Sequence, residues 1–386
     1  MDTERTRRDH PKAVDRLVRA IEGDIAKEVY DGAVVILAQR GKVLLHEAIG
    51  FAERESGRRM RHEDVFYLMS VTKALTGVSV LACVDRGQIL LTTPVAEVIP
   101  EFGVRGKHRV TIAHLLTHTG GMSSGVAPVP PGQLGNLAAV VAAVCEQPLE
   151  ARPGARVSYS PLTAHAILAE VVRRLDGGRR PYRQILAEDF LQPMDMRDTA
   201  LGLRPDLASR RVPVVVRDRT KGIIDAAALE SLNLLIQEET EMPGGGALAT
   251  ASDIFRWAEM LRRGGELDGV RILSRSMIEL ATTNHTGTLP NEIFDYAREM
   301  YGWPDFPAYL GLGFSLRGEG VFPTYFGLLA SPRTFGSIGI GSTVFWVDPE
   351  RQLTFVCLTS GLLEEGPSWN RFQRLSDLAI AAVDHG

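Results

Sequence analysis

The chain has 386 residues, of which 45% are hydrophobic and 23% charged, and its formal net charge is −4. These values are ordinary for a globular protein with two lobes or one large domain. Its 43 basic and 47 acidic residues form no basic face and no run of like charge, so nucleic acid is not an expected partner.

The N-terminal part of the sequence predicts a helix followed by a β-hairpin. Residues 1–16 are charged and lack the apolar segment of a secretory signal, and no run of about 18 apolar residues could cross a membrane. We therefore expect a cytoplasmic protein without a membrane partner. Apolar residues recur at helical spacing from Val14 to Val29. Residues 32–52 predict two strands that turn at residues 40–42.

A buried helix is predicted to begin at Ser70. Apolar residues recur at helical spacing from Ala74 to Ala82, until Gly87 ends the run, and Lys73 lies one turn after Ser70. A lysine in an apolar cleft loses hydration, so its pKa falls and it can accept the proton of a serine hydroxyl. The helix N-terminus adds N–H groups where an oxyanion would form. A serine cap followed by a solvated lysine would give the same short pattern.

The remaining segments predict an α/β (α+β) fold. Residues 92–229 are mostly helical, residues 342–360 predict a second hairpin, and apolar residues from Trp369 to Val383 predict a final amphipathic helix. The simplest arrangement is one antiparallel β-sheet flanked by N- and C-terminal helices, with an inserted mostly helical lobe. We expect a sheet domain of residues 1–91 and 230–386, a helical lobe of residues 92–229, and an active site in the cleft between them.

Aromatic residues are concentrated in residues 294–335, which hold 11 of the 26 in the chain. Such a cluster is typical of core packing or of a subunit contact. It could also form a wall for an apolar substrate group, with Trp303 and Tyr325 among its rings.

Other patterns predict no cofactor or metal site. His114 and His118 are four residues apart, but no third ligand is evident. The glycines at 244–246 are not followed by Lys-Ser/Thr, so they predict a tight turn and not a phosphate loop. Cys83 and Cys357 fall in apolar runs and are expected to be small buried hydrophobic residues.

Five further stretches, in order along the chain, resemble landmarks of a known superfamily. They are VDRGQILLTTPVAEVIPEF, TIAHLLTHTGGM, RPGARVSYSPLTAHAILAEVV, MPGGGALATASDIFRWAEMLRRGGELDG and YLGLGF…FGSIGIGSTVFWVDPE. With Ser70 and Lys73, they make the chain resemble the serine β-lactamase and penicillin-binding-protein superfamily from about residue 30 onward. The likeness is greatest to its class C-like branch, which includes family VIII-type carboxylesterases and acyltransferases. This resemblance implies a β-lactamase/transpeptidase-like fold.

The resemblance also implies roles for individual residues. Tyr159 matches the tyrosine that exchanges a proton with the serine and the leaving group, and the N–H groups of Ser70 and Ile340 would form the oxyanion hole. Two positions depart from the family pattern. Pro161 replaces an asparagine and offers no donor. Ser337-Ile338-Gly339 replaces Lys-Thr-Gly, so a cation is missing at Ser337, while Gly339 lets a substrate approach the strand.

These residues predict a serine hydrolase that acts on carboxylic esters through an acyl-Ser70 intermediate. Its expected partner is a small-molecule ester or acyl donor. An acyltransferase would use the same intermediate with another acceptor. A β-lactamase or D-amino-acid peptidase, and a binding protein of the same fold without activity, are the remaining alternatives. The acyl group, the acceptor and the oligomeric state stay open.

Overall fold

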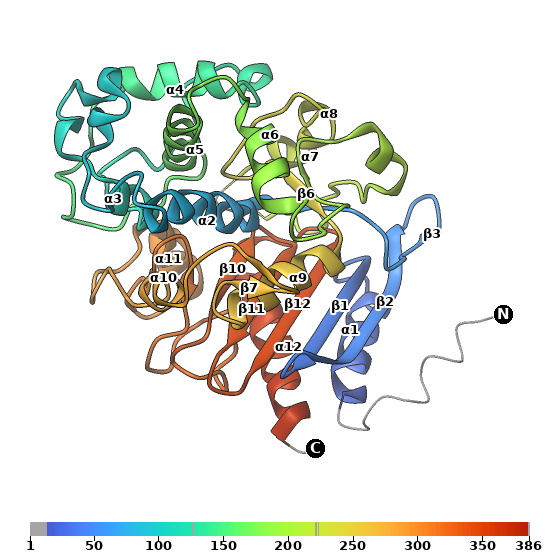
Figure 1. The fold of residues 1–386 in the computed structure, drawn as a ribbon. Coiled ribbons are helices and arrows are strands. Elements are labelled where there is room, and N and C mark those ends of the chain that lie inside the picture. Colours follow the sequence, from blue (N-terminus) through green and yellow to red (C-terminus); the bar gives the residue numbers. More distant parts are fainter. Residues whose placement is uncertain (1–13, 126, 221, 223, 385–386) are drawn as a thin grey trace.

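One seven-stranded antiparallel sheet organises the molecule. In the computed structural model, residues 14–125, 127–220, 222 and 224–384 are described; most of the charged start of the chain lies outside these ranges. The strands follow the order β3-β2-β1-β12-β11-β10-β9, so the two ends of the chain pair at the centre, where Val34 lies opposite Leu358 (Figure 1). The strands are β1 (Gly32–Gln39), β2 (Lys42–Glu53), β3 (Arg58–Arg59), β9 (Ser315–Leu316), β10 (Phe335–Gly339), β11 (Thr343–Asp348) and β12 (Leu353–Ser360).

Both predicted hairpins are confirmed, and local chemistry explains each turn. Arg40 and Gly41 have φ values of 52° and 81°, the positive pair that matches the twist of a tight hairpin. At the other hairpin, the buried Asp348 carboxylate accepts hydrogen bonds from the backbone N–H groups of Glu350 (3.1 Å) and Arg351 (3.0 Å). This side-chain cap fixes the turn between β11 and β12.

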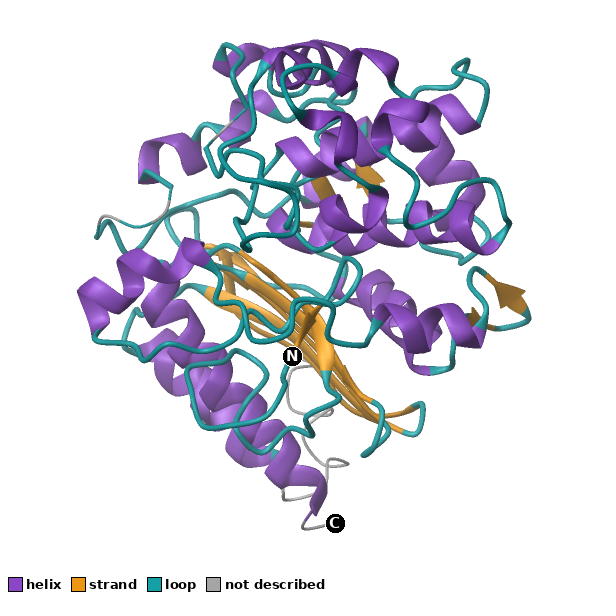
Figure 2. Cartoon of the chain, turned by 90° about the vertical axis from the view of Figure 1, so that its left-hand side faces the viewer, coloured by secondary structure: helices purple, strands orange, loops and turns teal. Residues whose placement is uncertain are grey.

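Helices cover both faces of the sheet. α1 (Asp15–Ala26) and α12 (Glu365–Asp384) pack together on one face, where their apolar residues form a core with β1, β11 and β12. Figure 2 shows the C-terminal helix running along the sheet. On the other face, α9 (Ala251–Arg262), whose Trp257 is buried, packs against β11 and β12. The predicted fold class and the predicted terminal helices are therefore confirmed.

A mostly helical region lies above the sheet (Figure 2). Helix α2 (Thr72–Asp85), which begins after Ser70, is buried along nearly all of its length and packs against α5 (Thr163–Leu175). The predicted domain boundaries stay a prediction. No helix in the described ranges has the length and hydrophobicity of a membrane span. The other helices are α3 (Ile112–Leu116), α4 (Leu137–Glu146), α6 (Tyr182–Leu186), α7 (Ala226–Glu230), α8 (Leu232–Leu235), α10 (Arg275–Ala281) and α11 (Asp295–Tyr301). Two small sheets contain β4 (Phe66–Tyr67), β5 (Ala200–Leu201) and β6 (Ala247–Ala249), and β7 (Glu266–Leu267) with β8 (Val270–Arg271).

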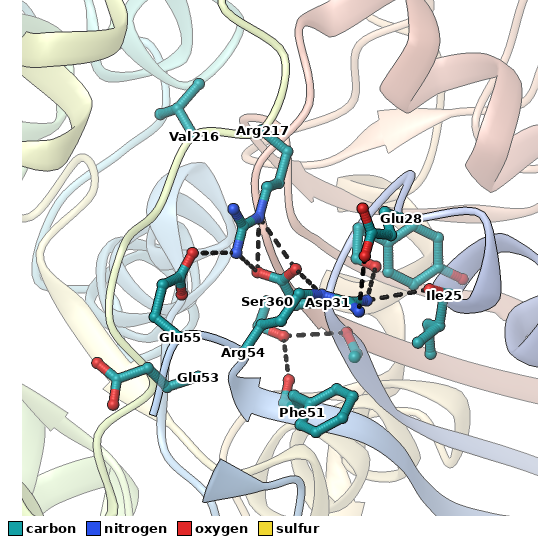
Figure 3. Close-up of polar contacts among 12 residues, drawn as sticks. Ile25, Glu28, Asp31, Phe51, Glu53, Arg54, Glu55, Val216, Arg217 and Ser360 are labelled. Carbon is teal, nitrogen blue, oxygen red and sulfur yellow. Dashed lines mark hydrogen bonds and ion pairs between the residues drawn. The ribbon is translucent and has the colours of Figure 1, made fainter. Parts of the chain in front are cut away.

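An ion cluster ties a distant loop to the sheet (Figure 3). Asp31, just before β1, is 2% exposed and accepts hydrogen bonds from Arg54 Nε (2.8 Å) and Arg217 Nε (3.0 Å to each oxygen). The backbone N–H of Arg217 also donates to the carbonyl oxygen of Leu362, two residues after β12. The cluster therefore holds the chain around Arg217 against the end of the central strands.

Candidate active site

Ser70 lies at the start of α2, as predicted. A short 3-10 turn (Met69–Val71) precedes the helix, and Met69 adopts a φ of 49°, which is costly for a residue with a side chain. The neighbouring carbonyl of Leu68 accepts a hydrogen bond from Thr343 Oγ1 at 2.9 Å. The first N–H groups of a helix have no acceptor within the helix. The backbone N–H of Ser70 is therefore available to a ligand.

Lys73 joins Ser70 to the glycine-rich turn at residues 244–246. Its Nζ donates hydrogen bonds to Ser70 Oγ at 3.0 Å and to the carbonyl oxygen of Gly244 at 2.6 Å. The side chain is buried, and the loss of hydration lowers its pKa to about 7. Close to neutral pH, a large fraction of Lys73 is thus an uncharged amine beside a serine hydroxyl.

Tyr159 completes a three-residue cluster around Ser70 Oγ. Its phenol donates a hydrogen bond to that oxygen at 2.8 Å, and Lys73 Nζ lies 4.9 Å from the centre of its ring. Burial raises the pKa of Tyr159 above its ordinary value, so the phenol form is favoured at neutral pH. The structure thus brings together Ser70, Lys73 and Tyr159, the three residues that the sequence selected.

His118 supports the segment that carries Tyr159. Its ring centre lies 4.5 Å from that of Tyr159, and its Nδ1 accepts the backbone N–H of Ser160 at 3.2 Å. Burial, with the nearby Lys73, lowers the pKa of His118 to about 3, so its imidazole is neutral. His114 caps α3 by accepting the backbone N–H of Thr111 on Nδ1. Among the described residues, no three His, Cys, Asp or Glu side chains form a group that could hold a metal ion.

The edge of β10 lies directly beside the serine. Ser337 Oγ donates to the carbonyl oxygen of Ser70 at 3.4 Å. A Cβ on Gly339 would come within 2.3 Å of the carbonyl oxygen of Leu68, so only glycine allows this approach. Ile340 follows in the turn between β10 and β11, and its N–H has no acceptor in the described parts of the chain. This N–H belongs to the residue for which the resemblance implies an oxyanion-donor role, and that role stays a prediction.

A largely apolar cavity of about 170 Å³ opens above Ser70. Tyr325 lines it, whereas Trp303 is not among its lining residues and packs instead against Phe294 and Trp369. The position of Trp303 thus does not support its predicted substrate contact. Besides Tyr159 and the imidazoles of His118 and His165, the aromatic rings that line the cavity are Phe294, Phe306, Tyr309, Phe314, Phe322, Tyr325, Phe326 and Trp369.

Three residues at the site were not predicted from the sequence to belong to it. The carbonyl of Gly244 accepts a hydrogen bond from the Lys73 amine, and the buried residues Asn291 and His165 are among those that line the cavity. Only the position of His165, on the helix that follows Tyr159, could have drawn attention to it. Contacts between distant segments brought the other two residues to the site.

Comparisons with known proteins agree with this geometry. A family model described as Beta-lactamase matches residues 15–378. Esterase EstB of Burkholderia gladioli is 32% identical over 261 residues, which cover 60% of this chain and 65% of EstB. A penicillin-binding protein homologue from Caulobacter crescentus has a TM-score of 0.81 and 24% identity, covering 97% of this chain and 98% of its own. A family VIII carboxylesterase has a TM-score of 0.77 and 22% identity, covering 96% and 98%.

Proposed function

Because the chain belongs to the β-lactamase family of serine hydrolases, we propose that it hydrolyses carboxylic esters through a covalent acyl-Ser70 intermediate. The observation that carries this proposal is that Lys73 Nζ and Tyr159 Oη both lie within hydrogen-bond distance of Ser70 Oγ, at 3.0 and 2.8 Å. A serine hydroxyl becomes an effective nucleophile when a neighbouring base can take its proton. The name of the relative EstB, an esterase, supports the same class of substrate.

Lys73 is the base in this proposal. With a pKa of about 7, its uncharged amine can accept the Ser70 proton as the oxygen attacks the ester carbonyl. Tyr159 keeps its proton, because burial raises the pKa of its phenol, and so it is suited to donate to the departing alkoxide oxygen. A phenolate base, which the resemblance also allowed, is less favourable for the same reason. The backbone N–H groups of Ser70 and Ile340 would hold the oxyanion.

Water would then release the acyl group by the reverse of these proton transfers, without a cofactor. The expected substrates are small esters with an apolar acyl part, because the lining of the cavity is largely apolar and includes several aromatic rings. Transfer to an alcohol or amine is the second candidate. The apolar lining of the cavity favours acyl transfer, because an organic acceptor can bind there and compete with water for the acyl group.

Intact-mass spectrometry with a panel of p-nitrophenyl esters tests the proposal. Mixing should add the mass of the acyl group to the wild-type chain and release p-nitrophenol with turnover, and Ser70→Ala should show neither. A wild-type chain that gains no mass and releases no p-nitrophenol would refute the proposal. Added alcohols separate the two candidates, because a transferase would form new esters in place of the free acid.

A further inference from the structure

Arg371, on α12, is a buried cation without a carboxylate partner in the described part of the chain. Its guanidinium lies over two rings, with its central carbon 4.7 Å from the centre of Tyr30 and 4.3 Å from that of Phe372. Its Nε and Nη1 atoms are buried and have no hydrogen-bond acceptor. Arginine keeps its charge in proteins, so this site holds a full positive charge in an apolar core.

The hydrogen bonds of Arg371 lead to the active site. Its Nη2 donates to the carbonyl oxygen of Gly341 at 3.1 Å and, at a longer 3.4 Å, to Ser368 Oγ. The Gly341 carbonyl also accepts the backbone N–H of Leu363 at 3.1 Å, so Arg371 is the charged one of its two donors. Gly341 is in the turn between β10 and β11, immediately after Ile340. Its φ is +68°, and a Cβ at this position would come within 2.5 Å of the carbonyl oxygen of Leu363, so the turn is tightly held.

Two peptide groups connect this carbonyl to the free N–H of Ile340. The carbonyl of Gly341 shares a peptide group with the N–H of Ser342, and this N–H donates to the carbonyl oxygen of Gly339 at 3.2 Å. The carbonyl of Gly339 shares its peptide group with the N–H of Ile340. In a trans peptide group the C=O and the N–H point in opposite directions. A hydrogen bond accepted by the Gly339 carbonyl therefore orients the Ile340 N–H toward the opposite side of that peptide group.

We infer that Arg371 is a positioning residue that orients and polarises the Ile340 N–H as an oxyanion donor, through the peptide groups of Gly341–Ser342 and Gly339–Ile340. Every hydrogen bond of this relay runs in the same direction, from the guanidinium toward the negative oxygen. Hydrogen bonds in such a chain strengthen one another, and a cation at its start adds to the effect. The inference rests on the proposed function, because it requires a reaction that forms an oxyanion at Ile340.

The cost of burial argues against a role in stability alone. A buried charge is expensive, and an apolar side chain of similar volume is often as stable or more so in its place. Methionine at residue 371 would pack against the same two rings but could not donate to Gly341. We therefore expect Arg371→Met to keep the fold and to remove the cation from the start of the relay, while Leu363 still donates to the Gly341 carbonyl.

The relay can be tested by NMR without any substrate. Labelling glycine carbonyls with ¹³C and isoleucine amides with ¹⁵N selects Gly–Ile pairs, of which the sequence has two, at 222–223 and 339–340. Arg371→Met should move the Ile340 amide proton upfield. Arg374→Met is the matched control, because Arg374 is on the same helix but is ion-paired with Asp24. An Ile340 signal that stays unchanged in Arg371→Met, or moves equally in both variants, would overturn the inference, even if the protein hydrolysed no ester.

Kinetics give a second, independent test. Per active site counted by burst titration, Arg371→Met should lower kcat about tenfold or more, less than the loss of an oxyanion donor itself, and leave KM within about threefold. Arg371→Lys, which restores a cation, should recover part of kcat. A phenylboronic acid forms a tetrahedral adduct that carries an oxyanion. Its affinity should fall in Arg371→Met by a factor similar to the loss of kcat. An unchanged kcat per titrated site in Arg371→Met would reduce Arg371 to a structural role, whereas absence of turnover in the wild type would instead count against the proposed function.

Discussion

Lys73 Nζ donates to the carbonyl oxygen of Gly244 at 2.6 Å, across 171 positions of the sequence. This contact holds the amine beside Ser70 Oγ at a place where the side chain is removed from water. Neither Gly244 nor Ser70 carries a negative charge that would offset the loss of hydration. The position of the amine and its lowered pKa therefore have the same structural origin.

The first prediction concerns the pH dependence of ester hydrolysis. Burial lowers the pKa of Lys73 to about 7, so below that pH the amine is protonated and cannot accept the Ser70 proton. The value of kcat/KM should fall about tenfold per pH unit below this pKa and level off above it. The measurement is a pH profile with an uncharged p-nitrophenyl ester. If kcat/KM instead fell only near pH 3, the titrating group would be His118, whose pKa burial lowers to about 3.

Lys73 and Tyr159 are predicted to act as one unit, since both contact the same oxygen atom. Lys73→Met and Tyr159→Phe should each lower kcat by at least about a hundredfold, and the double variant should be little worse than the poorer single variant. Single-turnover acylation rates measure the effect. Losses that multiply in the double variant would indicate independent roles.

β-Lactams are predicted to be poor substrates. Pro161 offers no amide donor, Ser337 carries no charge, and Lys73 is the only lysine or arginine among the described residues that line the cavity. Nitrocefin should therefore be hydrolysed with a kcat/KM at least about a thousandfold below that of the best p-nitrophenyl ester. Ser337→Lys should raise the nitrocefin value roughly tenfold, the equivalent of about 1.4 kcal/mol. Nitrocefin turnover equal to ester turnover in the wild type would contradict this prediction.

The cavity rings are predicted to set the preference for acyl length. Each CH₂ buried against them contributes about 0.8 kcal/mol, so kcat/KM should rise roughly fourfold per CH₂ until the cavity is full. Phe322→Ala should flatten this rise, because Phe322 lines the cavity and stacks on Phe306 at 4.9 Å. Trp303→Ala is the control outside the lining and should keep the wild-type profile. Equal chain-length profiles for the wild type and Phe322→Ala would assign the rings to packing alone.

Asp31 is predicted to matter for stability. Asp31→Asn would leave Arg54 and Arg217 facing a neutral amide in a largely buried site (Figure 3). We expect the free energy of unfolding to fall by about 3 kcal/mol, as for other broken buried ion pairs. Glu28→Gln is the matched control, since Glu28 is 75% exposed and lies 3.6 Å from Arg54, and it should change stability by less than about 0.5 kcal/mol. Urea unfolding gives both values, and equal values would assign no special role to the buried carboxylate.

Local patterns in the sequence predicted the main helices and hairpins and the pairing of Ser70 with Lys73. Strand-like runs joined by turn residues predicted both hairpins, and helical spacing predicted the buried helix at Ser70 and the final helix. Ser70 and Lys73 are three residues apart, on the 3-10 turn and the first turn of α2 that continues it, so their proximity follows from local helical geometry. Tyr159 came from the resemblance of its flanking residues, because the pattern around it says nothing about a serine 89 positions away.

Only the tertiary structure decided which segments pack against these hairpins and helices. Periodicity shows that a face is buried, but not which segment covers it, because that depends on packing between distant parts of the chain. Such packing places the Gly244 carbonyl beside Lys73 and the Arg371 guanidinium beside Gly341. It also leaves Trp303 outside the cavity lining. The sequence shows that aromatic residues are concentrated in residues 294–335. Which of their rings line the cavity depends on how each ring packs against its neighbours in space.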